Sequence, residues 1–372
     1  MRKRLLFYCQ PVLGIGHYIR SRAIVRALSD FDVCFVNGGE IVRGLEMPSE
    51  VEVVNLPALK SDAEFQQLQL SKSDFNLDEV KAQRTQQLRA TYDRIKPEVV
   101  VIELFPFGRR KFDFELLPLL EAIQSPTKVV CSLRDILVSK RQQEQFEQEA
   151  CTLMNRYFDL LLIHSDPNFQ RLEETFPRVP DLTCKVLYTG FVVQSRPLSE
   201  RKQNDVPTLL VSIGGGRVGH ELIDCAIAAS GLLTIRHHLH IVTGPHCPNE
   251  IFAQLQQRIA QQATISLERF TPDFPALLQQ ADLSISMAGY NTCMDILSAG
   301  VRAILYPFTG NNNQEQTMRA RKLEQLGRVR LIQQLDPAQL AEAITQSLQT
   351  PVPPVTIDMN GAAATARILS TL

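Results

Sequence analysis

Short runs of apolar residues alternate along the chain with segments in which apolar residues recur every three or four positions. Runs of the first kind are typical of buried strands, and the second pattern is typical of amphipathic helices. We expect strands at Leu5–Cys9, Val33–Val36, Val51–Leu56, Val99–Ile102, Lys128–Cys131, Leu160–Ile163, Lys185–Tyr188, Thr208–Ile213, Leu239–Thr243, Thr264–Leu267, Leu283–Ser286, Ala303–Tyr306 and Arg328–Leu331. We expect helices at Tyr18–Ser29, Glu79–Ile95, Glu221–Ala229, Glu250–Ala260, Asn291–Ala299, Gln314–Leu326 and Pro337–Leu348. This alternation predicts an α/β fold whose parallel sheets are covered by helices on both faces.

The alternation weakens at Thr189–Pro207, a polar and proline-bearing stretch with the composition of a linker. The length of 372 residues also favours more than one domain. We therefore expect two doubly wound Rossmann-like domains, residues 1–190 and 191–372, facing a cleft, with a last helix able to pack back on the first domain. Ligands of such sheets bind beyond the carboxyl ends of the strands.

Composition excludes several classes of protein. Apolar residues make up 44% of the chain and charged residues 21%, as in ordinary globular proteins. The formal net charge is −1, so no overall field attracts nucleic acid, and we expect no such partner. No apolar stretch approaches the roughly 20 residues that a membrane-spanning helix needs, and the first apolar run breaks at Gln10 and Pro11, unlike a signal peptide.

The eight cysteines are scattered, and none form a C-x-x-C pair. This spacing argues against a structural zinc site, and the apolar surroundings of most of the cysteines favour buried thiols in a reducing compartment. We expect a cytoplasmic protein and leave its oligomeric state open.

The first glycine loop, Gly14-Ile15-Gly16-His17, follows the first expected strand and opens a helix. A helix N-terminus of this kind can bind an anion. The dinucleotide fingerprint would need a third glycine and an acid after the second strand, but Ile19 stands at the glycine position and Asn37 ends the next strand. Both departures argue against a nicotinamide or flavin cofactor.

Two more glycine loops follow strands in the second half of the chain. Gly214-Gly215-Gly216 is either a phosphate cradle or a flexible turn. Met287-Ala288-Gly289 precedes a helix that carries Asp295 about one turn inside, where a carboxylate can accept hydrogen bonds from a ribose diol or can simply be a solvated helix acid. A polar cluster at Asn311–Gln316 follows the next strand and is either a rim of the same site or a capped loop.

These segments resemble the MurG-like family of GT-B glycosyltransferases, family 28. The donor-binding signature of that family is similar to "MAGYNTCMDILSAGVRAILYPF" and "EQTMRARKLEQLG" in this chain. A related bacterial group of glycosyltransferases, assigned from sequence, shares "GxGHxxRxxAIxxAL", "FPFGRRKFxxEL", "SLRDIL" and "EQxxRAxxLxxLG", which stand here at Gly14–Leu28, Phe105–Leu116, Ser132–Leu137 and Glu315–Gly327. The resemblance covers nearly the whole chain and implies a UDP-sugar as the donor substrate, with no other cofactor.

The resemblance also implies donor contacts, position by position. The diphosphate would lie against the three glycine loops, Asp295 would hold the ribose hydroxyls, and the uracil and the sugar would be bound by the segments at 270–271 and 315–316. The implied residues are Gly14, Gly16, Gly214, Gly215, Gly216, Phe270, Thr271, Met287, Ala288, Gly289, Asp295, Glu315 and Gln316. Where the family often has "NPVR" after the equivalent of Gly190, this chain has Phe191-Val192-Val193-Gln194, and Arg217 is a candidate to replace the missing basic contact.

The acceptor hydroxyl needs a base, and His17 is the leading candidate because its ordinary pKa of ~6.5 lies near working pH. The alternative is that His17 caps its helix or orders a phosphate. Asp135 and Glu103 also follow strands of the first domain and are weaker candidates. We expect no metal site, because the D-x-D sequence Asp30-Phe31-Asp32 precedes a strand and does not end one.

The acceptor is less well specified. The acceptor is either lipid-linked or a small natural product, and the irregular segment Lys60–Leu77 is a candidate to select it. Leu104–Leu120 combines aromatic residues with Arg109, Arg110 and Lys111, which is compatible with weak membrane contact but favours a helix start packed on the core. Two alternative functions stay open, namely a nucleotide-sugar hydrolase similar to the pseudaminic acid pathway enzyme and a non-catalytic nucleotide-sugar binding protein.

Overall fold

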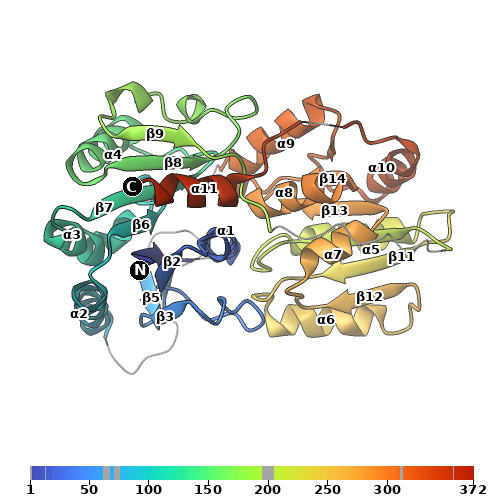
Figure 1. Cartoon of the computed structure of the whole chain (residues 1–372). Helices are drawn as coiled ribbons and strands as arrows, with labels where there is room; N and C mark the ends of the chain where they lie inside the picture. Colours follow the sequence, from blue (N-terminus) through green and yellow to red (C-terminus); the bar gives the residue numbers. More distant parts are fainter. Residues whose placement is uncertain are drawn as a thin grey trace. The chain divides into compact units, whose positions relative to one another are not determined.

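The computed structural model describes residues 2–12, 14–61, 68–70, 76–194, 205–310, 313–354 and 356–372. The chain forms two compact units (Figure 1), of which unit 1 contains Met1–Val193 and Ile357–Leu372 and unit 2 contains Gln194–Thr356. Residues 195–204 of the expected linker, residues 62–67 and 71–75 of the candidate acceptor segment, and Asn311 and Asn312 of the polar cluster lie outside the described residues.

Unit 1 is built on a seven-stranded, fully parallel sheet with the order β3-β2-β1-β6-β7-β8-β9. Its strands are β1 (Lys3–Cys9), β2 (Phe31–Asn37), β3 (Glu52–Asn55), β6 (Val99–Glu103), β7 (Lys128–Arg134), β8 (Leu160–His164) and β9 (Lys185–Tyr188). Its helices are α1 (Gly16–Ala27), α2 (Leu77–Ile95), α3 (Asp113–Ala122), α4 (Gln143–Tyr157) and α11 (Gly361–Ser370), and a small antiparallel pair joins β4 (Leu59–Ser61) to β5 (Leu68–Leu70).

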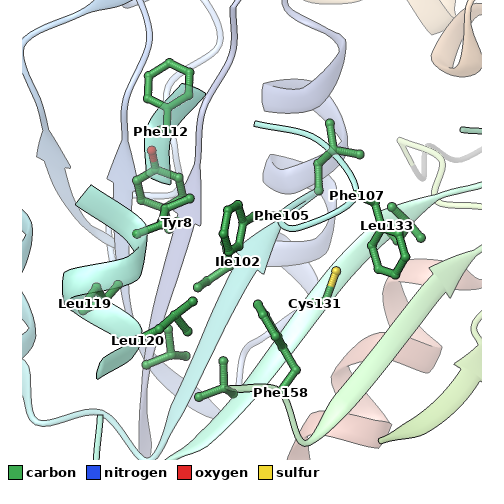
Figure 2. Close-up of a cluster of buried hydrophobic side chains, with 14 of the residues drawn as sticks. Tyr8, Ile102, Phe105, Phe107, Phe112, Leu119, Leu120, Cys131, Leu133 and Phe158 are labelled. Atoms are coloured by element: carbon green, nitrogen blue, oxygen red, sulfur yellow. The ribbon is translucent and has the colours of Figure 1, made fainter. Parts of the chain in front are cut away.

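The central strands of this sheet are mostly apolar and buried between their ends because helices cover both faces. Alternate residues of β1 and β6 enter two separate clusters. Leu6, Tyr8 and Ile102 pack with α2, α3 and α4, and Figure 2 shows this cluster around Tyr8 and Phe105. Leu5, Phe7 and their alternating neighbours pack with α1 and α11 on the other face.

The last helix completes unit 1. The backbone N–H of Phe191 donates to the carbonyl of Asp358 at 2.7 Å, and Val192 pairs with Asn360 in an isolated bridge. These bonds guide α11 onto α1, beside which it lies in Figure 1, and Leu369 is fully buried in the shared core.

A buried polar network supports the loops at the carboxyl edge of β1, β2 and β3. Arg84 of α2 is fully buried and binds both carboxylate oxygens of Glu115 at 2.6 and 2.8 Å. The same guanidinium donates to the carbonyls of Gly38 at 2.9 Å and Pro57 at 2.7 Å. Since each buried charge here has partners, the network fixes these loops without an uncompensated ion.

Unit 2 has a six-stranded parallel sheet with the order β12-β11-β10-β13-β14-β15. Its strands are β10 (Thr208–Ser212), β11 (His238–Val242), β12 (Ile265–Glu268), β13 (Leu283–Met287), β14 (Arg302–Tyr306) and β15 (Arg330–Leu331). Its helices are α5 (His220–Ser230), α6 (Asn249–Ile259), α7 (Phe274–Gln280), α8 (Tyr290–Ala299), α9 (Glu315–Gln325) and α10 (Pro337–Gln349).

Both sheets reverse their strand order once, and these reversals locate the ligand sites of doubly wound folds. In unit 1 the chain moves outward from β1 to β3 and then crosses to β6, so the switch lies between β1 and β6. In unit 2 the equivalent switch lies between β10 and β13. The first and third glycine loops and the Gly214–Gly216 loop all follow strands at these two switches. No described helix is long and apolar enough to cross a membrane.

Candidate functional site

The loop after β1 leads directly into α1, and His17 is the second residue of that helix. The N-cap residue Ile15 provides no side-chain hydrogen bond to the first turn. A Cβ added at Gly14 would meet no atom within 4 Å, so the space beside this glycine is open. The His17 side chain keeps 19% of its surface exposed, and it is therefore accessible from this loop.

His17 is held by a buried carboxylate from the neighbouring strand. Nδ1 of His17 lies 2.6 Å from Oε1 of Glu103, the last residue of β6, whose side chain has no exposed surface. Arg20, one turn further along α1 and 3% exposed, also donates to Oε1 of Glu103. The strand pairing of Tyr8 with Ile102 brings the ends of β1 and β6 level, which makes this three-residue contact possible.

The charges around His17 and Glu103 determine which of their atoms carry protons. Burial alone would raise the pKa of Glu103, but the adjacent His17, Arg20 and Arg109 outweigh it and lower the pKa well below its usual range. An ionised Glu103 requires that Nδ1 of His17 carries the proton and donates it, which leaves Nε2 as the free lone pair. Burial lowers the pKa of His17 from 6.5 to about 4, although Glu103 opposes the shift. The imidazole is therefore neutral, and able to accept a proton, at neutral pH.

The other two candidates for the base in unit 1, both carboxylates, are more deeply buried than His17. Glu103 contacts His17 as described, and Asp135, directly after β7, is 0% exposed. Full burial leaves neither carboxylate in a position to meet an acceptor that approaches from solvent. Glu103 instead orients His17.

The aromatic residues of Leu104–Leu120 are part of the core. Phe105, Phe107 and Phe112 are at most 2% exposed and lie in the cluster of Figure 2. Phe107 packs edge-on against Phe176 with ring centroids 5.0 Å apart. Packing on the core, the interpretation that the sequence favours for this segment, agrees with this burial.

In unit 2 the loop after β10 is closely packed against a neighbouring turn. Gly216 has φ of +88°, and a Cβ there would lie 2.5 Å from the carbonyl oxygen of Thr243. Gly214 has φ of +68° and faces open space. The backbone of this loop therefore requires glycine at 216 for close approach and exposes its surface at 214. Arg217 follows it, half-buried.

The loop after β13 ends at Gly289, the N-cap residue of α8, which forms no side-chain cap. Met287 and Ala288 are buried, and Gly289 leaves room because a Cβ there would meet only Thr292 Oγ1 at 3.9 Å. Asp295 lies in the second turn of α8 and is 6% exposed. No hydrogen bond to its side chain is found in the described part of the chain, and burial raises its pKa from 3.8 to about 7.

The remaining donor candidates also lie in unit 2. Phe270 and Thr271 are half-buried in the loop after β12. Glu315 begins α9 and pairs with fully buried Arg319 at 2.9 Å, while Gln316 accepts a hydrogen bond from the backbone N–H of Phe308 at 3.0 Å. Arg319 also donates to the carbonyl of Ala288 at 3.0 Å. Arg319 thus connects the start of α9 to the loop after β13.

Sequence reasoning missed Arg20 and Arg319 as members of the site. Arg20 stands three positions after His17, and Arg319 stands four positions after Glu315, so both spacings place the pairs on one helix face. That spacing was the available signal. The Glu103 and Ala288 contacts depend on tertiary structure and carry no local signal.

The described residues contain no group of three or more His, Cys, Asp or Glu side chains arranged to hold a metal ion. In β11, Nε2 of His240 lies 2.9 Å from Oε1 of Glu268 in β12, and His238 contacts Ser266 at 2.8 Å. These histidines pair across strands and do not converge on one point.

Comparison with known proteins connects these features to a family. Residues 209–366 match the glycosyltransferase family 28 C-terminal domain. Two similar curated proteins are UDP-N-acetylglucosamine–N-acetylmuramyl-(pentapeptide) pyrophosphoryl-undecaprenol N-acetylglucosamine transferases. The one from Paracidovorax citrulli is 29% identical over 163 residues, 44% of this chain and 45% of the relative. The one from Acidithiobacillus ferrooxidans is 31% identical over 151 residues, 39% of this chain and 41% of the relative.

The chain spans less than half of the length of each of these curated relatives. Solved structures match over the whole chain at lower identity. MurG of Acinetobacter baumannii has a TM-score of 0.59 at 16% identity, covering 100% of both chains. The calicheamicin glycosyltransferase CalG4 has a TM-score of 0.60 at 16% identity, covering 100% of this chain and 94% of that one. The chain therefore carries the C-terminal domain of glycosyltransferase family 28 and has the GT-B fold of two Rossmann-like domains.

Proposed function

We propose that this protein is an inverting, metal-independent glycosyltransferase that moves a sugar from a UDP-sugar to a hydroxyl group. The family 28 match covers the unit that would bind the donor. In this proposal unit 2 binds the nucleotide sugar and unit 1 supplies the base. The observation that carries the proposal is the 2.6 Å contact between Nδ1 of His17 and Oε1 of Glu103.

His17 would act as the general base. The buried Glu103 accepts the Nδ1 proton, which fixes the ring and directs the free Nε2 away from the carboxylate. Nε2 takes the proton of the acceptor hydroxyl while that oxygen attacks the anomeric carbon, and the bond from this carbon to the diphosphate oxygen breaks. Attack opposite to the leaving group inverts the configuration. A positioned base of this kind contributes about 10²–10⁴-fold to the rate.

Unit 2 would stabilise the departing diphosphate with backbone N–H groups. The N-terminus of α8 has no side-chain cap, and the helix dipole favours negative charge there. Asp295 is a buried carboxylate without a described protein partner, as expected of a group that accepts hydrogen bonds from the two ribose hydroxyls. The uracil would contact Phe270 and Thr271, the sugar would contact Glu315 and Gln316, and Arg217 would add positive charge. The glycines of unit 2 that would line the diphosphate are Gly214, Gly215, Gly216 and Gly289, with Met287 and Ala288 beside them.

By analogy with the curated relatives, we propose that the acceptor is linked to a lipid. The names of the two curated relatives state an acceptor that is linked to undecaprenol through a pyrophosphoryl group. A lipid-linked acceptor would place this protein at the cytoplasmic face of a membrane, as a peripheral protein. All eight cysteines are thiols that form no disulfide, which supports a reducing compartment.

The test is nucleoside diphosphate release from a panel of nucleotide sugars, with and without candidate hydroxyl acceptors. Release that depends on an acceptor supports transfer. A product whose anomeric configuration is opposite to that of the donor sugar supports inversion. Equal release in water alone would indicate the alternative, a nucleotide-sugar hydrolase. Binding without turnover across the panel would indicate a non-catalytic binding protein. EDTA should leave the rate unchanged, and a loss that Mg²⁺ restores would contradict the metal-independent mechanism.

A further inference from the structure

The loop after β6 holds a guanidinium that the proposed chemistry does not use. The loop runs from Leu104 to Arg109 and leads into a short 3₁₀ helix, Arg110–Phe112. Phe105 and Phe107 anchor it in the core (Figure 2). Leu104 and Arg109 both have left-handed backbone conformations, with φ of 68° and 61°. Such conformations in residues other than glycine cluster at functional sites.

Close packing fixes the path of this loop. A Cβ at Gly108 would lie 2.8 Å from Cδ2 of Leu104, so the two ends of the loop contact each other. The backbone N–H of Leu104 donates to the carbonyl of Ser132 in β7 at 2.9 Å. The loop therefore presents Arg109 at the carboxyl edge of β6 and β7, the same edge that carries His17.

The side chain of Arg109 has no ion pair or hydrogen bond to any residue that the structure describes, although its Nε atom is buried. The carboxylate that acts most strongly on it is Glu103, which already binds His17 and Arg20. A guanidinium presents five N–H donors in a planar arrangement that matches phosphate oxygens. Arg109 thus has donors available for a ligand.

More positive charge gathers around Arg109. Arg134 is the last residue of β7, and its positive charge contributes to lowering the pKa of Arg109. Lys140 lies before α4, with Nζ 5.7 Å from the ring centroid of Phe146. Desolvation and the charges of Arg134, Arg109 and Lys111 lower the pKa of Lys140. Like charges that are brought together in this way repel, and an anion bound among them would relieve the repulsion.

We propose that Arg109, together with Arg134 and Lys140, binds a phosphate or diphosphate group of the acceptor substrate. This inference rests on the proposed function, since it places the anionic group of the acceptor at the edge where His17 would deprotonate its hydroxyl. The aromatic residues of the loop support the site from the core, and its basic residues recognise a charged head group.

The test is isothermal titration of inorganic pyrophosphate into the full chain in the presence of saturating UDP, which occupies the donor site of unit 2. The wild type should bind pyrophosphate, and Arg109→Ala should weaken this binding at least tenfold. Arg110→Ala is the matched control, because Arg110 is the next residue along the chain but is paired with Asp113 at 3.2 Å and Glu149 at 3.4 Å. This control should change the affinity less than twofold.

Three results would overturn the inference. In the first, the wild type and Arg109→Ala bind pyrophosphate equally well. In the second, Arg109→Ala and Arg110→Ala weaken pyrophosphate binding equally. In the third, all pyrophosphate binding is lost once UDP is bound. Thermal unfolding of each variant tests its folding, and Arg109→Lys should retain an intermediate affinity if the fold is intact. Failure here is distinct from failure of the proposed function. A chain that releases UDP from a nucleotide sugar without binding pyrophosphate contradicts only this inference, and the converse result contradicts only the proposed reaction.

Discussion

Nδ1 of His17 lies 2.6 Å from Oε1 of Glu103, and the two residues are 86 positions apart in the chain. His17 keeps part of its surface exposed, whereas the Glu103 side chain has none. A buried carboxylate that orients a partly exposed imidazole is the arrangement of a general base held in place by a third group.

Glu103→Gln should lower kcat about 10- to 100-fold, because an amide still accepts the Nδ1 hydrogen bond but no longer stabilises the imidazolium that forms. The UDP dissociation constant should stay unchanged, since Glu103 lies in unit 1. Glu98→Gln is the control, an exposed glutamate just before the same strand, and should leave kcat unchanged. If Glu103→Gln retains wild-type kcat and stability, Glu103 is not required to orient His17.

The pH profile should reflect the lowered pKa of His17. The base works only when neutral, so activity is present above the pKa and is lost below it. At saturating UDP-sugar, which removes the titration of free Asp295 from the profile, a His17 pKa of about 4 should keep kcat level from pH 8 to pH 5 and let it fall only at lower pH. An acid limb centred at ~6.5, the ordinary value for histidine, would contradict this assignment.

The lowered pKa of His17 also affects the unfolding free energy of the protein. The folded pKa of His17 lies below the unfolded value of 6.5, so its contribution is complete above pH 6.5 and is lost as the pH falls toward 4. Fully buried His164, whose pKa burial lowers to about 3, behaves in the same way. Wild-type unfolding free energy should therefore decrease between pH 6.5 and 4, and His164→Gln should reduce that slope in urea titrations. An unchanged slope would show that protonation of His164 does not drive the loss.

Asp295→Asn should stabilise the free protein and weaken UDP binding. The folded pKa of Asp295 is raised to about 7, so its ionisation destabilises the fold progressively from pH 3.8 to pH 7 and fully above that range. At pH 8 the asparagine variant should gain roughly 2–4 kcal/mol in unfolding free energy. Its UDP affinity should fall about 10-fold or more, because an amide has one acceptor oxygen where the carboxylate has two. Unchanged UDP affinity in calorimetry would remove Asp295 from the donor site.

Arg319→Met should weaken UDP-sugar binding more than UDP binding. Arg319 holds both Glu315, a proposed sugar contact, and the carbonyl of Ala288, so its loss displaces the start of α9. Arg321→Met is the control on the same helix, because Arg321 is exposed. We expect KM for the UDP-sugar to rise about 10-fold with a smaller change in the UDP dissociation constant, since breaking a buried pair costs about 3–5 kcal/mol before relaxation. Equal weakening of both ligands would indicate a purely structural role.

The sequence pattern was sufficient for the fold but only for part of the site. Alternating apolar runs locate the strands because buried parallel strands are apolar throughout, and β1 and β10 start near the expected positions. The helix α4 was not expected, since its sequence "QEQFEQEACTLMNRY" is mostly polar. The glycine loops and His17 are recognisable because local strand–loop–helix order places them at strand ends, and Asp295 stands in the helix that follows the third loop.

Contacts between distant residues were not predictable in the same way. Glu103 was a candidate for the base itself, and only the pairing of β1 with β6 shows that it contacts His17 and has no exposed surface. Arg109 stood out only as one of three basic residues in a row. Its difference from Arg110 depends on which guanidinium has an acidic partner, and that is a property of the folded chain.

The most direct test of the account is UDP release by His17→Ala and His17→Gln, measured with the nucleotide sugar and acceptor that support turnover by the wild type, alongside the UDP dissociation constant. The account predicts that both variants bind UDP as the wild type does and lose at least 100-fold in kcat. Wild-type turnover by either variant with unchanged UDP affinity would contradict the assignment of His17 as the base.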